Sequence, residues 1–116
     1  MKRFFSSFGY AWTGLRRAWS EQPNLRFHTV AATIVIAFAF YVQVSGGEWI
    51  ALGLTIGMVI TAELINTAIE NLVDLISPEN NPLAGKIKDV AAGAVLVSAA
   101  TAIVVGCIIF AKYIFP

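Results

Sequence analysis

Residues 49–76, WIALGLTIGMVITAELINTAIENLVDLI, contain no helix breaker before Ser77-Pro78. The stretch is apolar as far as Ala62, and it then mixes apolar with acidic and amide side chains. A helix of about 28 residues is roughly 42 Å long, which exceeds a hydrocarbon core of roughly 30 Å. We therefore expect a membrane-spanning helix whose last turns project from the bilayer.

The composition of the whole chain also indicates a bilayer as its solvent. Of the 116 residues, 58% are hydrophobic and only 13% are charged, and the mean hydropathy is +0.74. Soluble domains are usually about half apolar and about a quarter charged. The length allows a single domain over residues 1–116. The net charge of +1 indicates no particular partner, and we expect no nucleic-acid partner.

Sequence patterns predict three further helices. Residues 27–44 and 87–113 are apolar enough for membrane spans, and turn residues predict a tight turn at 45–48 and a loop at 77–86. In residues 1–26, aromatic side chains recur every three to four positions among basic ones, which predicts a helix lying on the membrane surface. The expected fold is an all-α membrane protein with three transmembrane helices and an N-terminal amphipathic surface helix.

The basic residues predict the orientation of these spans. Seven lie on the side that carries the N-terminus and the loop between the second and third spans, whereas only Lys112 lies on the other. The seven are Lys2, Arg3, Arg16, Arg17, Arg26, Lys86 and Lys88. Since cytoplasmic loops carry an excess of basic residues, we expect a multi-pass protein of the bacterial cytoplasmic (inner) membrane with a cytoplasmic N-terminus.

Small residues predict close helix packing. Gly53 and Gly57 form a GxxxG pattern in the second span, and the third span is rich in alanine. Small side chains let helices approach closely in lipid. Because three spans provide little internal surface, we expect a homo-oligomer; packing within one protomer is the alternative.

Four polar residues fall on one stripe of the second span. At 100° per residue, Glu63, Asn66, Glu70 and Asp74 lie within about 80° of one another. Ionisable residues inside a membrane helix are costly, and by default they are functional candidates. Glu63 is expected to lie below the inner membrane interface, and Glu70 near the boundary.

This arrangement suits phosphoryl transfer to a lipid alcohol. Glu70 could hold Mg²⁺, which prefers oxygen ligands, and the deeper Glu63 could accept a hydroxyl proton. Lys88, which opens the third span, could neutralise phosphate oxygens. The same residues would also suit a proton or cation path in a non-enzymatic oligomer. A third hypothesis is that the protein is a scaffold subunit without chemical activity. Neither GxxxxGK[ST] nor GxGxxG is present, so ordinary nucleotide-binding folds are excluded.

Three motifs carry a resemblance to a known family. ELINTAIENLVD at 63–74 and AGKIKDVAAGAV at 84–95, together with GYAWTGLR at 9–16, closely resemble the prokaryotic diacylglycerol kinase / undecaprenol kinase family. The resemblance covers nearly the whole chain. It implies a lipid kinase that depends on ATP and Mg²⁺ and works as a homotrimeric helical bundle, with active sites shared between neighbouring subunits.

The resemblance also implies roles for individual residues. By this resemblance, Glu63 takes the position of the family's catalytic base, and Glu70 takes that of a metal ligand that also contacts the nucleotide. Asn66 is implied to line the site, and Asp74 to support it. The nucleotide contacts that it implies are Arg3, Tyr10, Glu79, Asn80, Asn81, Lys88 and Asp89.

Two positions depart from the family pattern. The second metal-binding glutamate of the diacylglycerol kinase form aligns with Gln22, and Glu21, one residue earlier, is our expected substitute. His28 replaces another glutamate of that form, and its context, Asn-Leu-Arg-Phe-His, is similar to the undecaprenol-phosphorylating branch. This favours a polyprenol over diacylglycerol as substrate. For His28 itself, the structural alternative is an interfacial histidine bonded to backbone or solvent.

Overall fold

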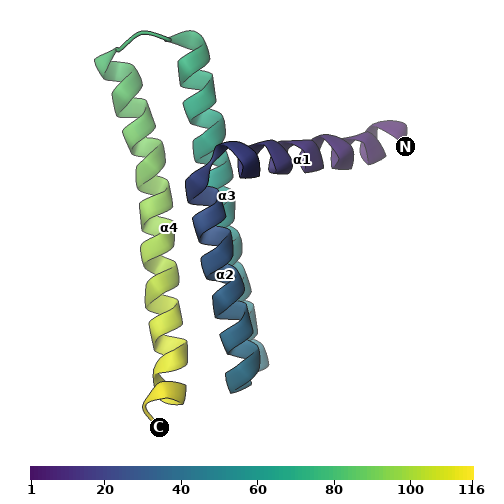
Figure 1. The fold of residues 1–116 in the computed structure, drawn as a ribbon, viewed down its shortest axis with the longest axis vertical. Coiled ribbons are helices and arrows are strands. Elements are labelled where there is room, and N and C mark those ends of the chain that lie inside the picture. Colours follow the sequence, from purple (N-terminus) through teal and green to yellow (C-terminus); the bar gives the residue numbers. More distant parts are fainter.

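The structure, a computed structural model, describes residues 1–116 as four helices: α1 (Lys2–Glu21), α2 (Pro23–Val42), α3 (Gly46–Ile76) and α4 (Pro82–Ile114). Helices α3 and α4 form a long antiparallel hairpin, and α2 packs along α3 (Figure 1). Helix α1 leaves this bundle sideways, so that the N-terminus lies far from the other helices (Figure 1). The loop 77–81 closes the hairpin at one end.

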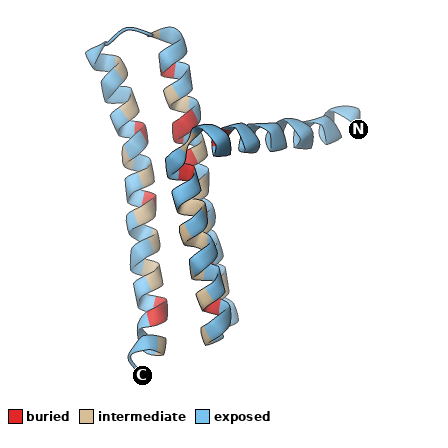
Figure 2. Ribbon diagram, in the orientation of Figure 1, coloured by how far each residue is buried: buried red, intermediate tan, exposed pale blue.

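Helices α2, α3 and α4 are each long and apolar enough to cross a membrane. The prediction of an all-α membrane protein with three spans is therefore confirmed. Helix α3 has 31 residues and is roughly 46 Å long, so it extends well beyond a hydrocarbon core. Most apolar side chains of the spans are exposed in one chain (Figure 2).

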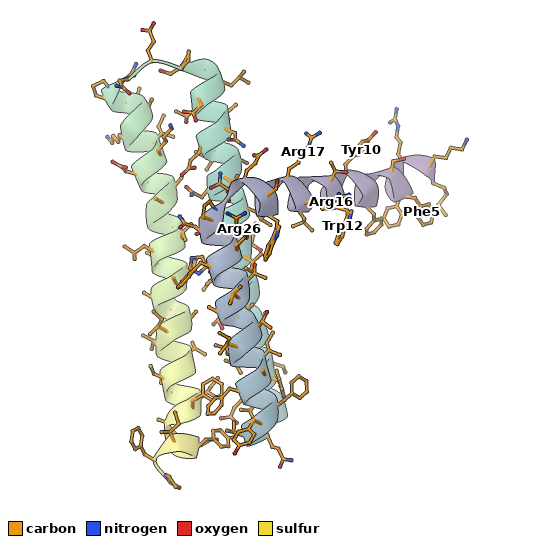
Figure 3. All side chains as sticks on the ribbon, viewed as in Figure 1. Phe5, Tyr10, Trp12, Arg16, Arg17 and Arg26 are labelled. Carbon is orange, nitrogen blue, oxygen red and sulfur yellow. The ribbon has the colours of Figure 1, made fainter.

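The side chains of α1 divide between two faces. Phe5 and Trp12 point to the side on which α2 runs, whereas Tyr10 and Arg17 point to the side of the α3–α4 loop (Figure 3). An amphipathic helix places its apolar face in the bilayer and its polar face in water. The level of α1 along the bundle therefore indicates where the membrane surface lies.

The corner between α1 and α2 corrects the predicted boundary of the surface helix. That helix was expected to continue to residue 26, but it ends at Glu21, and residues 23–26 form the first turn of α2. Pro23 occupies the first position of α2, where its missing N–H would have no partner in any case. Gln22 before it adopts an extended backbone, as residues before proline prefer.

The turn between α2 and α3 lies earlier than expected. Residues 46–48 belong to α3, and the chain reverses at Gln43, whose φ of 58° is in the left-handed region. Ser45 and Glu48 form a capping box that starts α3 ahead of the two glycines: Glu48 N–H donates to Ser45 Oγ, and Ser45 N–H donates to Glu48 Oε1. The glycines therefore open the helix rather than make the turn.

The third span also starts earlier than predicted. Residues 82–86, which were expected in the loop, are helical, because Asn81 Oδ1 accepts from Leu83 N–H and Pro82 occupies the first turn. Lys88 and Asp89 consequently lie in the second turn of α4 instead of at its start.

The end of the bundle opposite the α3–α4 loop holds a buried apolar core. Its buried residues come from all three spans and the α2–α3 turn: Ala39, Val44, Leu52, Ile109 and Phe110. Next to this core, both oxygens of Glu48 bind α4. Tyr113 Oη donates to Glu48 Oε1 at 2.6 Å, and Lys112 Nζ lies 2.9 Å from Glu48 Oε2. Glu48 thus caps its own helix and ties the end of α4 to the start of α3.

We expect Glu48→Gln to lower the midpoint of thermal unfolding, because it removes the charge that attracts Lys112. Glu48→Ala should lower it further, since it also removes the acceptor for Tyr113 and for Ser45 N–H. Differential scanning fluorimetry on the detergent-solubilised protein measures both. Tyr113→Phe is the matched control, and it should cause a smaller loss than Glu48→Ala. Equal midpoints for Glu48→Ala and the wild type would contradict this role.

Candidate active site at the membrane interface

The polar stripe of α3 becomes more exposed from residue to residue toward the loop. Glu63 is 3% exposed and Asn66 is 8% exposed, Glu70 is half-buried, and the side chain of Asp74 is 61% exposed. The α3 residues that face α1 across a cleft lie between Leu64 and Asn71. Glu63 therefore lies just on the membrane side of α1, and Asp74 lies beyond it. This gradient matches the depths expected from the sequence.

Glu63 meets His28 of α2 across the helix interface. His28 Nε2 lies 3.2 Å from Glu63 Oε1. The hydroxyl of Thr67 binds the backbone oxygen of Glu63 and leaves the carboxylate free. His28 is thus the only side chain that pairs with this buried carboxylate. His28 therefore contacts a carboxylate of the stripe, while its side chain remains 20% exposed.

One turn closer to the loop, Asn66 and Glu70 are joined. Asn66 Nδ2 donates to Glu70 Oε1 at 3.2 Å. Asn66 Oδ1 is buried and has no hydrogen-bond partner. Native proteins seldom leave a buried polar atom unpaired, and such atoms commonly mark functional positions or bound water. Glu70 retains a second carboxylate oxygen that no side chain binds.

An apolar groove of about 720 Å³ leads to this region from inside the membrane. All three spans line it, and its residues range from Phe115 and Ile114 of the C-terminal end to Phe27 and His28 of α2. Fifteen of its 17 lining residues are hydrophobic, and His28 is the only histidine among them. The groove therefore offers an apolar chain a path that ends beside the His28–Glu63 pair.

A second, polar pocket of about 410 Å³ lies at the α3–α4 loop. Five of the predicted site residues line it, namely Asp74, Glu79, Asn80, Asn81 and Lys88. Lys88 Nζ is paired with Asp74 Oδ1. The structure thus brings four expected nucleotide contacts, Glu79, Asn80, Asn81 and Lys88, together with Asp74, whereas Asp89 is exposed and does not line the pocket.

Other predicted residues are not brought together within one chain. Glu21 lines a cleft of about 610 Å³ between α1 and α3, on the α3 face of Thr67 and Asn71. No contact joins it to Glu70. Tyr10 lies on the part of α1 that projects away from the bundle, and Arg3 precedes it near the N-terminus (Figure 3).

The donor chemistry of the stripe fits a hard divalent cation in part. No three His, Cys, Asp or Glu side chains gather into a complete metal site in the chain. Mg²⁺ usually keeps several waters, however, and is held by one or two carboxylates together with substrate phosphates. Glu70, with one unbound oxygen at the depth of the membrane surface, fits such a ligand.

Comparison with known proteins decides the family. The model of the family described as prokaryotic diacylglycerol kinase matches residues 9–110. The chain belongs to the prokaryotic diacylglycerol kinase family. The resemblance found in the sequence is therefore confirmed, and so is the expected enzyme class, a lipid kinase.

Three relatives show the range within the prokaryotic diacylglycerol kinase family. The undecaprenol kinase of Bacillus subtilis (strain 168) is 43% identical over 110 residues, which are 95% of this chain and 89% of that protein. The diacylglycerol kinase of Escherichia coli (strain K12) is 33% identical over 92% of this chain and 88% of its own length. The diacylglycerol kinase of Synechocystis is 42% identical over 86% of this chain, which spans 58% of that protein.

Sequence reasoning missed the pairing of His28 in this family member. A signal was available, because ionisable groups inside membrane helices usually pair with one another, and His28 and Glu63 both lie in predicted spans. Arg17 and Asn71, which line the α1–α3 cleft beside Glu21, were not predicted as site residues either. Nothing in the local sequence distinguishes these two side chains from ordinary surface residues.

Proposed function

We propose that this protein phosphorylates a membrane-dissolved lipid alcohol, with ATP as phosphate donor and Mg²⁺ as cofactor, at the cytoplasmic face of the bacterial inner membrane. The observation that carries the proposal is the exposure gradient from Glu63 to Asp74 across the level of α1. A lipid hydroxyl and a water-soluble nucleotide can meet only at the boundary between their two solvents, and the stripe crosses that boundary.

Each end of the stripe suits one of the two substrates. On the membrane side, the apolar groove that ends at His28 suits a lipid tail. On the water side, the loop pocket offers Lys88 for phosphate oxygens and the amides of Asn80 and Asn81 for further polar contacts. Glu63 and Glu70 lie between these two sites on α3.

In the proposed reaction, the carboxylate of Glu63 accepts the proton of the lipid hydroxyl. The hydroxyl oxygen forms a bond to the γ-phosphorus of ATP, and the bond from that phosphorus to the β-phosphate oxygen breaks, which releases ADP. Lys88 stabilises negative charge on the phosphates, and burial of Glu63 keeps water away from the base. Mg²⁺ held by Glu70 would offset the charge that develops on the transferred phosphoryl group.

We further propose that the protein works as a homotrimer. The apolar faces of the spans are largely exposed in one chain, and Gly53 and Gly57 have open space around them. A neighbouring copy could cover these faces by close helix approach. It could also supply the Arg3, Tyr10 and Glu21 side chains, which do not reach Glu70 within one chain.

Undecaprenol is the favoured substrate. This choice is supported by the undecaprenol kinase of Bacillus subtilis as a relative at 43% identity and by the sequence around His28. An assay with radiolabelled ATP and Mg²⁺, run side by side on undecaprenol and diacylglycerol in mixed micelles, tests it. We expect label in both lipids or in undecaprenol alone, with the higher kcat/KM for undecaprenol. No labelled lipid in either reaction would overturn the proposed function, and preference for diacylglycerol would overturn the choice of lipid.

A further inference from the structure

The buried carboxylate of Glu63 depends on one side chain from another helix. Its only polar side-chain partner is His28, with Nε2 and Oε1 3.2 Å apart. Glu63 is 3% exposed and the side chain of His28 is 20% exposed. A buried carboxyl group is costly unless a polar partner compensates it, and His28 is the only side chain placed to do so.

The chemistry of the pair assigns the proton on the imidazole. An ionised carboxylate can only accept hydrogen bonds. In the proposed reaction Glu63 is an ionised base, so we expect the histidine nitrogen that faces it, Nε2, to carry a hydrogen. This interaction occupies Oε1 of Glu63 and leaves Oε2 without a side-chain partner, so Oε2 is the oxygen available to a substrate hydroxyl.

The groove adds a second, independent observation. His28 lines the apolar groove, whereas Glu63 does not. An apolar chain lying in the groove therefore has His28, and not the buried carboxylate, as its polar neighbour. His28 is thus placed where it can orient Glu63 toward a hydroxyl at the end of the groove. The rings of Phe27 and His28 form an edge-to-face pair, with centroids 5.6 Å apart.

We propose that His28 is a positioning residue for the reaction, which holds the Glu63 carboxylate in one orientation through the Nε2–Oε1 contact. This inference rests on the proposed function, in which Glu63 is the base. A group that orients a base acts on turnover and leaves the nucleotide site unaffected, because His28 does not line the loop pocket.

Kinetics of His28 variants give the first test. We expect His28→Ala to lower kcat roughly 10- to 100-fold, the order of loss expected when a charged group loses a polar partner, with KM for ATP unchanged. His28→Gln, whose amide nitrogen can reach the position of Nε2, should recover most of the loss. Thr29→Val is the matched control on α2, because the Thr29 hydroxyl binds only the Leu25 carbonyl of the same helix. It should keep wild-type kcat.

A double-mutant cycle separates positioning from general damage. If His28 acts through Glu63, adding His28→Ala to Glu63→Gln should cost little beyond Glu63→Gln alone. Losses that multiply in the double variant would overturn the proposal. So would wild-type kcat in His28→Ala, or an equal loss in His28→Ala and His28→Gln.

A spectroscopic readout does not depend on activity. His28 is the only histidine of the chain, so the imidazole ¹⁵N signals of a labelled sample in lipid nanodiscs belong to this residue alone. We expect a protonated Nε2 whose signals shift in Glu63→Gln and stay unchanged in Glu48→Gln. Unchanged His28 signals in Glu63→Gln would show that the pair does not form. This measurement tests the His28–Glu63 contact even if the lipid assay shows no activity. Absence of lipid kinase activity would overturn the proposed function, whereas unchanged His28 signals would overturn the role of His28.

Discussion

Glu63→Gln is expected to lose most of the turnover and to keep its binding of ATP–Mg²⁺. Glutamine has nearly the shape of glutamate and can still accept from His28 Nε2, so the α2–α3 interface should remain intact. It cannot take up a proton from a hydroxyl at neutral pH, however. General-base catalysis commonly contributes roughly 10²- to 10⁴-fold, and kcat should fall by that order while KM for ATP stays unchanged.

Steady-state kinetics with radiolabelled ATP and the preferred lipid measure the loss, and titration with a fluorescent ATP analogue measures binding. Glu48→Gln is the matched control, because it makes the same substitution on the same helix at the opposite end of the bundle. It should keep wild-type kcat at temperatures below its own unfolding. Full activity of Glu63→Gln would refute its role as base, and a loss of ATP binding in that variant would assign Glu63 to the nucleotide instead.

Glu70→Gln should act on the metal. The amide oxygen of glutamine can still accept from Asn66 Nδ2, so the local packing is preserved. A neutral amide is a weaker ligand for Mg²⁺ than a carboxylate. Even loss of an outer partner of a metal ligand lowers metal affinity roughly 10- to 100-fold, and we expect the Mg²⁺ concentration for half-maximal activity to rise at least as much.

A Mg²⁺ titration at saturating ATP and lipid measures this shift, and Mn²⁺ binding followed by electron paramagnetic resonance gives a readout without turnover. Glu21→Gln distinguishes two arrangements of the metal site. Glu21 does not contact Glu70 within one chain, so an equal shift in both variants would require a neighbouring copy to bring Glu21 to the metal. An unchanged Mg²⁺ requirement in Glu70→Gln would contradict its assignment as a ligand.

The starts of α3 and α4 show what local sequence rules can predict about helix boundaries. The Ser45–Glu48 capping box and the Asn81-Pro82 start were both readable, since they depend on residues within one turn. The predicted boundaries were wrong because glycine and proline were taken as turn residues, and the caps that precede them were not weighed. Tertiary information was not needed to place these starts correctly.

The sequence by itself determined the three spans, the amphipathic surface helix and the single stripe of Glu63, Asn66, Glu70 and Asp74. Each follows from hydropathy and from the 3.6-residue period of a helix, which are properties of one segment. The motif match that shows the family also lies in the linear sequence.

Only the tertiary structure decided which side chains meet across helices. The His28–Glu63 pair joins residues from α2 and α3, and the Glu48–Tyr113 bond joins the two ends of the α3–α4 hairpin. The tertiary structure also showed that Glu21 does not contact Glu70 within one chain. Such contacts depend on how each helix is rotated about its axis when it packs, and periodicity within one helix leaves that rotation undetermined. The stripe was therefore predictable. For its deepest carboxylate the sequence indicated only that a partner within the spans is expected, and the packing of α2 on α3 identified that partner as His28.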